Sequence, residues 1–136
     1  MKINGWFVLA TLAMAQSLVV IGCSSAPTEC VGASCVCDSA DCNLACAGTS
    51  QSGCALSCGA DNTSCAMSCP GGSCNVECSG SESCTLDCPG GSCNLTCTGA
   101  KTCQITSCEK SCNLFCGGAA TCTSSCDATG SCNTKP

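Results

Sequence analysis

The sequence predicts a small all-β protein, a disulfide-rich β-solenoid with about five coils of 19–20 residues and two short strands per coil. Three observations lead to this fold class. Units with cysteine at both ends recur along the chain, as in Cys74–Cys78 and Cys93–Cys97. Short turns rich in glycine and serine separate the units. The units also repeat at a nearly fixed spacing, which indicates stacking.

Each unit has the side-chain alternation of a β-strand. In "CNLTC", Cys93, Leu95 and Cys97 share one face of an extended chain, while Asn94 and Thr96 point the other way. Leucine, methionine or valine takes the centre of the units that begin at Cys42, Cys54, Cys65, Cys74, Cys84, Cys93 and Cys112. Helices are the alternative, but such short units between Gly/Pro turns are too short to be stable helices.

Every second unit recurs at nearly the same interval. The opening cysteines of one series are spaced 20, 19, 19 and 20 residues apart, at Cys54, Cys74, Cys93, Cys112 and Cys132. Those of the other series are all 19 apart, at Cys65, Cys84, Cys103 and Cys122. The unit from Cys103 to Cys108 has one extra residue, but a shorter connection follows it and preserves the period.

Four segments are expected along the chain. Residues 1–22 are predicted to be a signal peptide, because Lys2 supplies positive charge and an apolar run extends from Trp6 to Ile21. A transmembrane anchor is the competing interpretation of that run. Residues 23–29 are expected to form a short tether, residues 30–41 an atypical N-terminal cap, and residues 42–136 the repeat solenoid.

The leader ends in Val20-Ile21-Gly22-Cys23. This motif resembles the lipobox of bacterial lipoproteins, in which an aliphatic residue, a small or aliphatic residue and glycine or alanine precede an invariant cysteine. The resemblance implies cleavage before Cys23 and acylation of its sulfur and amino group, which anchors the chain in a lipid bilayer. It also implies an extracytoplasmic place in the bacterial cell envelope, with the outer membrane favoured because Ser24 rather than aspartate follows. Ordinary cleavage, which leaves Cys23 free, is the alternative.

The chain after the leader is mildly acidic and almost free of aromatic residues. Residues 23–136 contain three lysines and nine carboxylates, a formal charge of 3 − 9 = −6, and Phe115 is their one aromatic residue. This charge argues against nucleic-acid partners. The chain has no histidine, so we expect no enzyme, no catalytic residue and no cofactor. Glu77 and Asp87 occupy the same position in consecutive units, which suggests the paired carboxylates of a hydrolase. Both are, however, expected to face solvent on opposite sheets.

Twenty-two cysteines remain when Cys23 is set aside (23 − 1 = 22), and in an exported chain we expect them in disulfides. The two cysteines of one strand lie about 13 Å apart, beyond the roughly 7 Å that a bridge allows between Cα atoms. The favoured pairs therefore flank turns: Cys46–Cys54, Cys58–Cys65, Cys69–Cys74, Cys78–Cys84, Cys88–Cys93, Cys97–Cys103, Cys108–Cys112, Cys116–Cys122 and Cys126–Cys132, with Cys30, Cys35, Cys37 and Cys42 paired among themselves. Bridges between stacked coils, such as Cys74–Cys93, are the alternative.

Asparagines recur on one predicted sheet at 19, 19 and 20 residues, at Asn75, Asn94, Asn113 and Asn133. Stacked coils would align them as a ladder, which stabilises parallel in-register strands. A regular binding face is the alternative role. The repeat resembles the disulfide-rich β-helical antifreeze proteins of insects, which implies a similar fold, although only Thr96-Cys97-Thr98 and Thr121-Cys122-Thr123 match their Thr-x-Thr arrays.

These observations favour a membrane-anchored, extracytoplasmic structural or interaction module whose protein or glycan partner no motif identifies. The second interpretation is a metal-binding lipoprotein, since the cysteine density resembles that of metallothioneins. Cys35-Val36-Cys37 is, however, the only closely spaced pair, thiolate ligands need reduced sulfur, and no metal site is assigned. An ice- or ligand-binding solenoid is the third interpretation.

Overall fold

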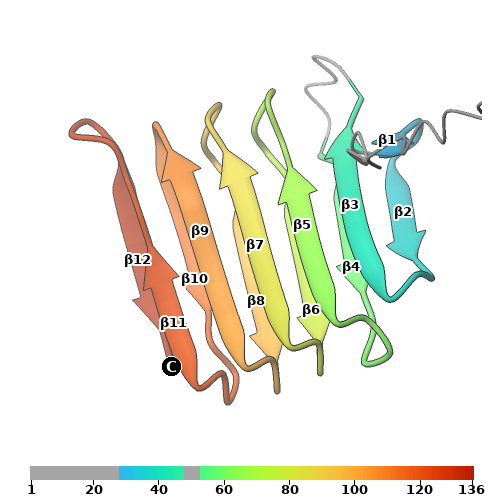
Figure 1. The fold of residues 1–136 in the computed structure, drawn as a ribbon. Helices are drawn as coiled ribbons and strands as arrows, with labels where there is room; N and C mark the ends of the chain where they lie inside the picture. The colour runs from blue at the N-terminus through green and yellow to red at the C-terminus, as the bar shows by residue number, and fades with distance from the viewer. Residues whose placement is uncertain (1–27, 48–52) are drawn as a thin grey trace, which may run out of the picture.

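The computed structural model describes residues 28–47 and 53–136, and Figure 1 shows these residues as two layers of strands. The described residues contain no helix, and none of their segments is a helix able to span a membrane. The strands are β1 (Thr28–Cys30), β2 (Ser34–Cys37), β3 (Asp41–Cys46), β4 (Ala55–Cys58), β5 (Ser64–Ser68), β6 (Asn75–Ser79), β7 (Ser83–Cys88), β8 (Asn94–Thr98), β9 (Thr102–Cys108), β10 (Ser111–Phe115), β11 (Thr121–Ser124) and β12 (Ser131–Lys135).

The strands form two six-stranded parallel sheets, one of odd-numbered and one of even-numbered strands. The chain crosses from one sheet to the other after every strand, so each coil contributes one strand to each layer (Figure 1). Equivalent residues pair from coil to coil, as Cys65 pairs with Cys84 and Cys84 with Cys103. The predicted fold class, an all-β solenoid of about five coils with two strands each, is confirmed.

The first strands belong to the same stack. β1 pairs with β3 in the odd-numbered sheet, and β2 pairs with β4 in the even-numbered sheet. Much of the segment expected as a cap, residues 30–41, thus lies in strands that extend both sheets. This segment differs from the middle coils because its aliphatic side chains are exposed, with exposed fractions of 85% for Val31 and 64% for Val36. This end of the solenoid therefore presents more apolar surface than the middle.

The core is a narrow line of aliphatic side chains between the sheets. The inward residues of the odd-numbered sheet are Leu44, Met67, Leu86 and Ile105, and those of the even-numbered sheet are Leu56, Val76, Leu95 and Leu114. All eight are buried, and the four in β7 to β10 have no exposed surface. Burial of each such side chain contributes about 1.5–3 kcal/mol relative to leaving it in water. Cysteines flank this line on both sides.

The extra residue between Cys103 and Cys108 is absorbed by a bulge. Leu86 pairs with Ile105 and Asp87 pairs with Ser107, so Thr106 has no opposite residue in β7. A bulge of this kind accommodates one additional residue and leaves the pairing on both sides intact. Cys88 and Cys108 consequently stay in register. The length of the unit changes, but the position of its sulfur atoms does not.

The two PGGS turns stack closely on each other. Gly72 and Gly91 adopt φ angles of +76° and +73°, which glycine tolerates and residues with a Cβ rarely adopt. The backbone N–H of Ser73 donates a hydrogen bond to the carbonyl of Gly91 at 2.9 Å. A Cβ added at Gly72 would collide with that same carbonyl oxygen and with the backbone of Gly90. The turns therefore require glycine for conformation and also for space.

The last coil closes the core with polar groups. Ser124 of β11 pairs with Ile105 and so continues the aliphatic line of the odd-numbered sheet, and Thr134 of β12 likewise follows Leu114. The Ser124 and Thr134 hydroxyls lie 3.0 Å apart and form a hydrogen bond between the sheets. Hydrogen-bonded hydroxyls thus replace the aliphatic pair in this coil and make its interior more polar than that of the coils before it.

Candidate functional site

The structure joins the 22 cysteines of the described residues in eleven disulfides. The cysteines of this part of the chain pair in succession, the first with the second and the third with the fourth, and the bridged Cα atoms lie 5.8–6.5 Å apart. The nine turn-flanking pairs given above, from Cys46–Cys54 to Cys126–Cys132, are all joined. In the first coils Cys30 is bonded to Cys35 and Cys37 to Cys42. No bridge in this part of the chain joins equivalent cysteines of stacked coils, such as Cys74 and Cys93.

The disulfides form two columns, one along each edge of the flattened coil. Column 1 lies where the chain passes from the odd-numbered to the even-numbered sheet, and contains Cys30–Cys35, Cys46–Cys54, Cys69–Cys74, Cys88–Cys93, Cys108–Cys112 and Cys126–Cys132. Column 2 lies at the opposite edge, and contains Cys37–Cys42, Cys58–Cys65, Cys78–Cys84, Cys97–Cys103 and Cys116–Cys122. In-register stacking brings sulfur atoms of neighbouring coils together in each column.

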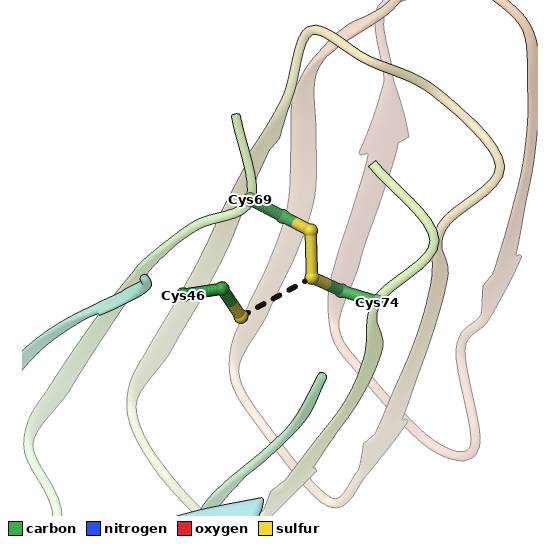
Figure 2. A group of neighbouring side chains, drawn as sticks. All are labelled: Cys46, Cys69 and Cys74. Atoms are coloured by element: carbon green, nitrogen blue, oxygen red, sulfur yellow. Dashed lines mark hydrogen bonds between the residues drawn. A yellow bond between two sulfur atoms is a disulfide. The ribbon is translucent and has the colours of Figure 1, made fainter. Parts of the chain in front are cut away.

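The closest approach described between two disulfides is in column 1. The Sγ atoms of Cys46 and Cys74 lie 3.3 Å apart, although they belong to different disulfides (Figure 2). Neither sulfur carries a hydrogen in this state, so the dashed line in Figure 2 marks a non-bonded contact. The Sγ atoms of Cys46, Cys69 and Cys74 all lie within 4.8 Å of one another, and the three residues are buried. The group lies beside the first PGGS turn, which connects Cys69 to Cys74.

Three more groups of sulfur atoms have the same compactness. They are Cys69 with Cys88 and Cys93, Cys58 with Cys65 and Cys78, and Cys108 with Cys126 and Cys132. Three thiolates at such distances could hold zinc or copper. Each group contains a complete disulfide, however, and a disulfide sulfur is not a thiolate. Metal binding by these sulfurs would require prior reduction.

The predicted asparagine ladder lies on the outer face of the even-numbered sheet. The side-chain amide of Asn94 donates to Oδ1 of Asn75 at 2.9 Å, and that of Asn113 donates to Oδ1 of Asn94 at 2.8 Å. Asn133 continues the series to Asn113 at 3.4 Å. Each inner asparagine thus donates one amide hydrogen and accepts another, which ties four coils together through side chains.

Replacement of an inner ladder residue is expected to cost more stability than replacement of a terminal one. Asn94→Ala removes two hydrogen bonds from a half-buried site and should lower the free energy of unfolding by about 1–2 kcal/mol. Asn133→Ala removes a single long bond and should cost under about 0.5 kcal/mol. Urea unfolding of the oxidised variants measures the difference. Equal losses would show that the ladder hydrogen bonds contribute nothing specific.

The outer face of the odd-numbered sheet carries hydroxyl groups that the sequence analysis overlooked. Ser64, Ser83, Thr102 and Thr121 occupy paired positions on β5, β7, β9 and β11. A second row, two residues further along each strand, consists of Ala66, Thr85, Gln104 and Thr123. The signal was available, because the first row recurs at exact 19-residue intervals just before each opening cysteine. The outer face of the even-numbered sheet is therefore distinguished by its asparagine ladder, and that of the odd-numbered sheet by its unbroken row of hydroxyls.

Few charged groups interact on these surfaces. Lys101 forms an ion pair with Glu82 of the preceding coil, and this hydrogen bond together with the lysine charge lowers the pKa of the Glu82 carboxyl. The Lys135 ammonium lies 5.3 Å from the centre of the Phe115 ring, across neighbouring strands. Glu77 and Asp87 lie on β6 and β7, in different sheets, and are exposed. The two carboxylates therefore lie on different sheets, and the Asp87 carboxylate accepts a hydrogen bond from the Ser107 hydroxyl.

Cys23 and the preceding leader lie outside the described residues. No family model matches the chain, and neither a curated protein nor a solved structure is detectably similar to it. The class of the protein therefore rests on its own structure. That class is a disulfide-rich β-solenoid, consistent with a structural cysteine-rich module.

Proposed function

We propose that the protein is an exported lipoprotein whose disulfide-rich solenoid acts as a rigid structural or interaction module at the bacterial cell envelope. The observation that carries this proposal is the pairing of all 22 described cysteines. Disulfides in such number persist in oxidising compartments outside the cytoplasm and are rare inside it. The leader and the Val20-Ile21-Gly22-Cys23 motif supply the corresponding route and anchor.

The position of the first strand supports this arrangement. β1 begins at Thr28, five residues after Cys23 (28 − 23 = 5), so acyl chains on Cys23 would hold this end of the stack close to the bilayer. The exposed valines Val31 and Val36 lie in the same first coil. The faces with the hydroxyl row and the asparagine ladder would then project away from the membrane on opposite sides of a narrow, cross-linked stack. Such a module can display regularly spaced polar groups to a protein or glycan.

Lipidation can be tested by metabolic labelling with an alkyne fatty acid in a bacterial host. The wild-type protein is expected to take up label and to fractionate with membranes, because two or more acyl chains anchor stably. Cys23→Ser should abolish labelling and move the protein to the soluble fraction or leave its leader uncleaved. Ser25→Ala is the matched control, since it leaves the four-residue motif intact. An unlabelled, soluble wild-type protein would refute the lipoprotein assignment.

A further inference from the structure

We propose that column 1 is a thiol–disulfide exchange site in which the Cys46 thiolate, once released from Cys54, attacks the neighbouring Cys69–Cys74 disulfide at Cys74. The inference goes beyond the structural role proposed above and does not depend on lipidation. It starts from the 3.3 Å separation between the Sγ atoms of Cys46 and Cys74 (Figure 2). A bond between them needs a sulfur–sulfur distance of about 2.05 Å, so the atoms must approach by roughly 1.3 Å. Side-chain rotation can supply a shift of this size.

The reaction is balanced by an external dithiol. The dithiol reduces Cys46–Cys54 to two thiols and becomes a disulfide itself. The Cys46 thiolate then forms a bond to Sγ of Cys74, the Cys69–Cys74 bond breaks, and Cys69 leaves as a thiolate that takes a proton from water. This second step is redox-neutral. Its products are a Cys46–Cys74 disulfide and free thiols at Cys54 and Cys69.

The same geometry allows a further step in the same direction. Sγ of Cys69 lies within 4.8 Å of the sulfur atoms of both Cys88 and Cys93. The released Cys69 thiolate can therefore attack that disulfide, forming a bond to one of its sulfurs and releasing the other as a thiolate. After a single reduction at Cys46–Cys54, one free thiol thus moves stepwise from disulfide to disulfide along column 1. Each exchange replaces a bridge across a turn by a bridge between coils, so the reduced stack stays cross-linked.

Cys54 provides a matched comparison within the same disulfide. The three-sulfur group contains Cys46, Cys69 and Cys74 but not Cys54. Both cysteines of the pair are buried to a similar degree, with exposed fractions of 6% for Cys46 and 4% for Cys54. Removal of either one leaves one unpaired thiol and deletes the same bridge. The two variants therefore differ in whether the remaining thiol belongs to the three-sulfur group.

The test uses the full-length variants Cys54→Ser and Cys46→Ser, incubated without reductant at pH 8.5. The free thiols are trapped by alkylation in denaturant, and the proteins are digested unreduced for peptide mapping. In Cys54→Ser we expect most of the alkylation at Cys69, Cys88 or Cys93, and a peptide that links Cys46 to Cys74. In Cys46→Ser the label should stay on Cys54, with alkylation of Cys69 lower by about tenfold or more. Lowering the pH to 6 should slow the exchange, because the thiolate is the nucleophile.

Two results would overturn the proposal. Alkylation confined to Cys46 in the Cys54→Ser variant would show that the contact is unreactive. Equal scrambling from both variants would show that exchange follows general unfolding and not the geometry of column 1. Far-ultraviolet circular dichroism of both variants, recorded before alkylation, detects such unfolding. The wild-type protein treated with one equivalent of dithiothreitol should yield the same Cys46–Cys74 peptide, and its absence there would also contradict the proposal.

Discussion

Reduction of all eleven disulfides is expected to unfold the protein in the absence of any denaturant. The bridged residues are separated by only four to eight positions, so each bridge closes a small loop worth about 2 kcal/mol in the chain-entropy model. The loops follow one another without nesting, which makes their contributions close to independent. Together they amount to about 20 kcal/mol, more than the roughly 5–15 kcal/mol of net stability that is usual for a domain.

Circular dichroism and amide hydrogen exchange before and after reduction with alkylation measure this loss. We expect the strand signal to disappear and backbone amides of β7 and β8 to lose their protection. The control is the oxidised protein carried through the same alkylation step, which should keep both signals. A reduced, alkylated chain that retained protected amides would show that the strand ladders and the aliphatic line suffice without covalent closure.

Gly72→Ala is expected to be the most disruptive single change at a turn. A residue with a Cβ pays about 1–2 kcal/mol to adopt a left-handed conformation such as the φ of +76° found here. The new Cβ would also meet the backbone of Gly90 and Gly91 in the next coil. Relief of that collision requires the coils to separate, which weakens the Ser73–Gly91 hydrogen bond. We expect a total loss of about 3–5 kcal/mol in the free energy of unfolding.

Gly99→Ala separates the two contributions. Gly99 has a similar φ of +72°, but a Cβ at this position would meet no atom within 4 Å. This variant should lose only the conformational part, about 1–2 kcal/mol. Guanidinium unfolding of both oxidised variants gives the comparison. Equal losses in the free energy of unfolding would mean that the close stacking of the PGGS turns does not contribute to stability.

The fold class could be predicted because its information is local and repeated. Alternation within Cys93–Cys97 predicts one strand, and the 19-residue period stacks that strand on its equivalents. Once C-x-x-x-C is extended, bridge geometry excludes pairing within a unit, and the short turns leave few partners in reach. The asparagine ladder follows from the same period, and the structure adds its hydrogen bonds.

Features that depend on side-chain packing could not be predicted in this way. The extra residue before Cys108 is visible in the sequence, but its placement as a bulge at Thr106 depends on keeping both flanking pairs in register. Ser124 is an evident departure from the aliphatic series, yet its partner Thr134 lies on the other sheet. The short distance between the Sγ atoms of Cys46 and Cys74 depends on the side-chain conformations of two disulfides. The spacing of cysteines in the sequence does not determine these conformations.

The strict succession of the bridges also bears on biosynthesis. In the described residues the cysteines are bonded in consecutive pairs, the first with the second and the third with the fourth, from Cys30–Cys35 to Cys126–Cys132. A chain that emerges from a translocation channel N-terminus first would expose its cysteines in this same order. An oxidase that couples each newly exposed thiol to its predecessor would then produce the native pattern directly, although 22 cysteines allow an enormous number of other pairings. If the chain is exported as proposed, its maturation should need an oxidase and no isomerase.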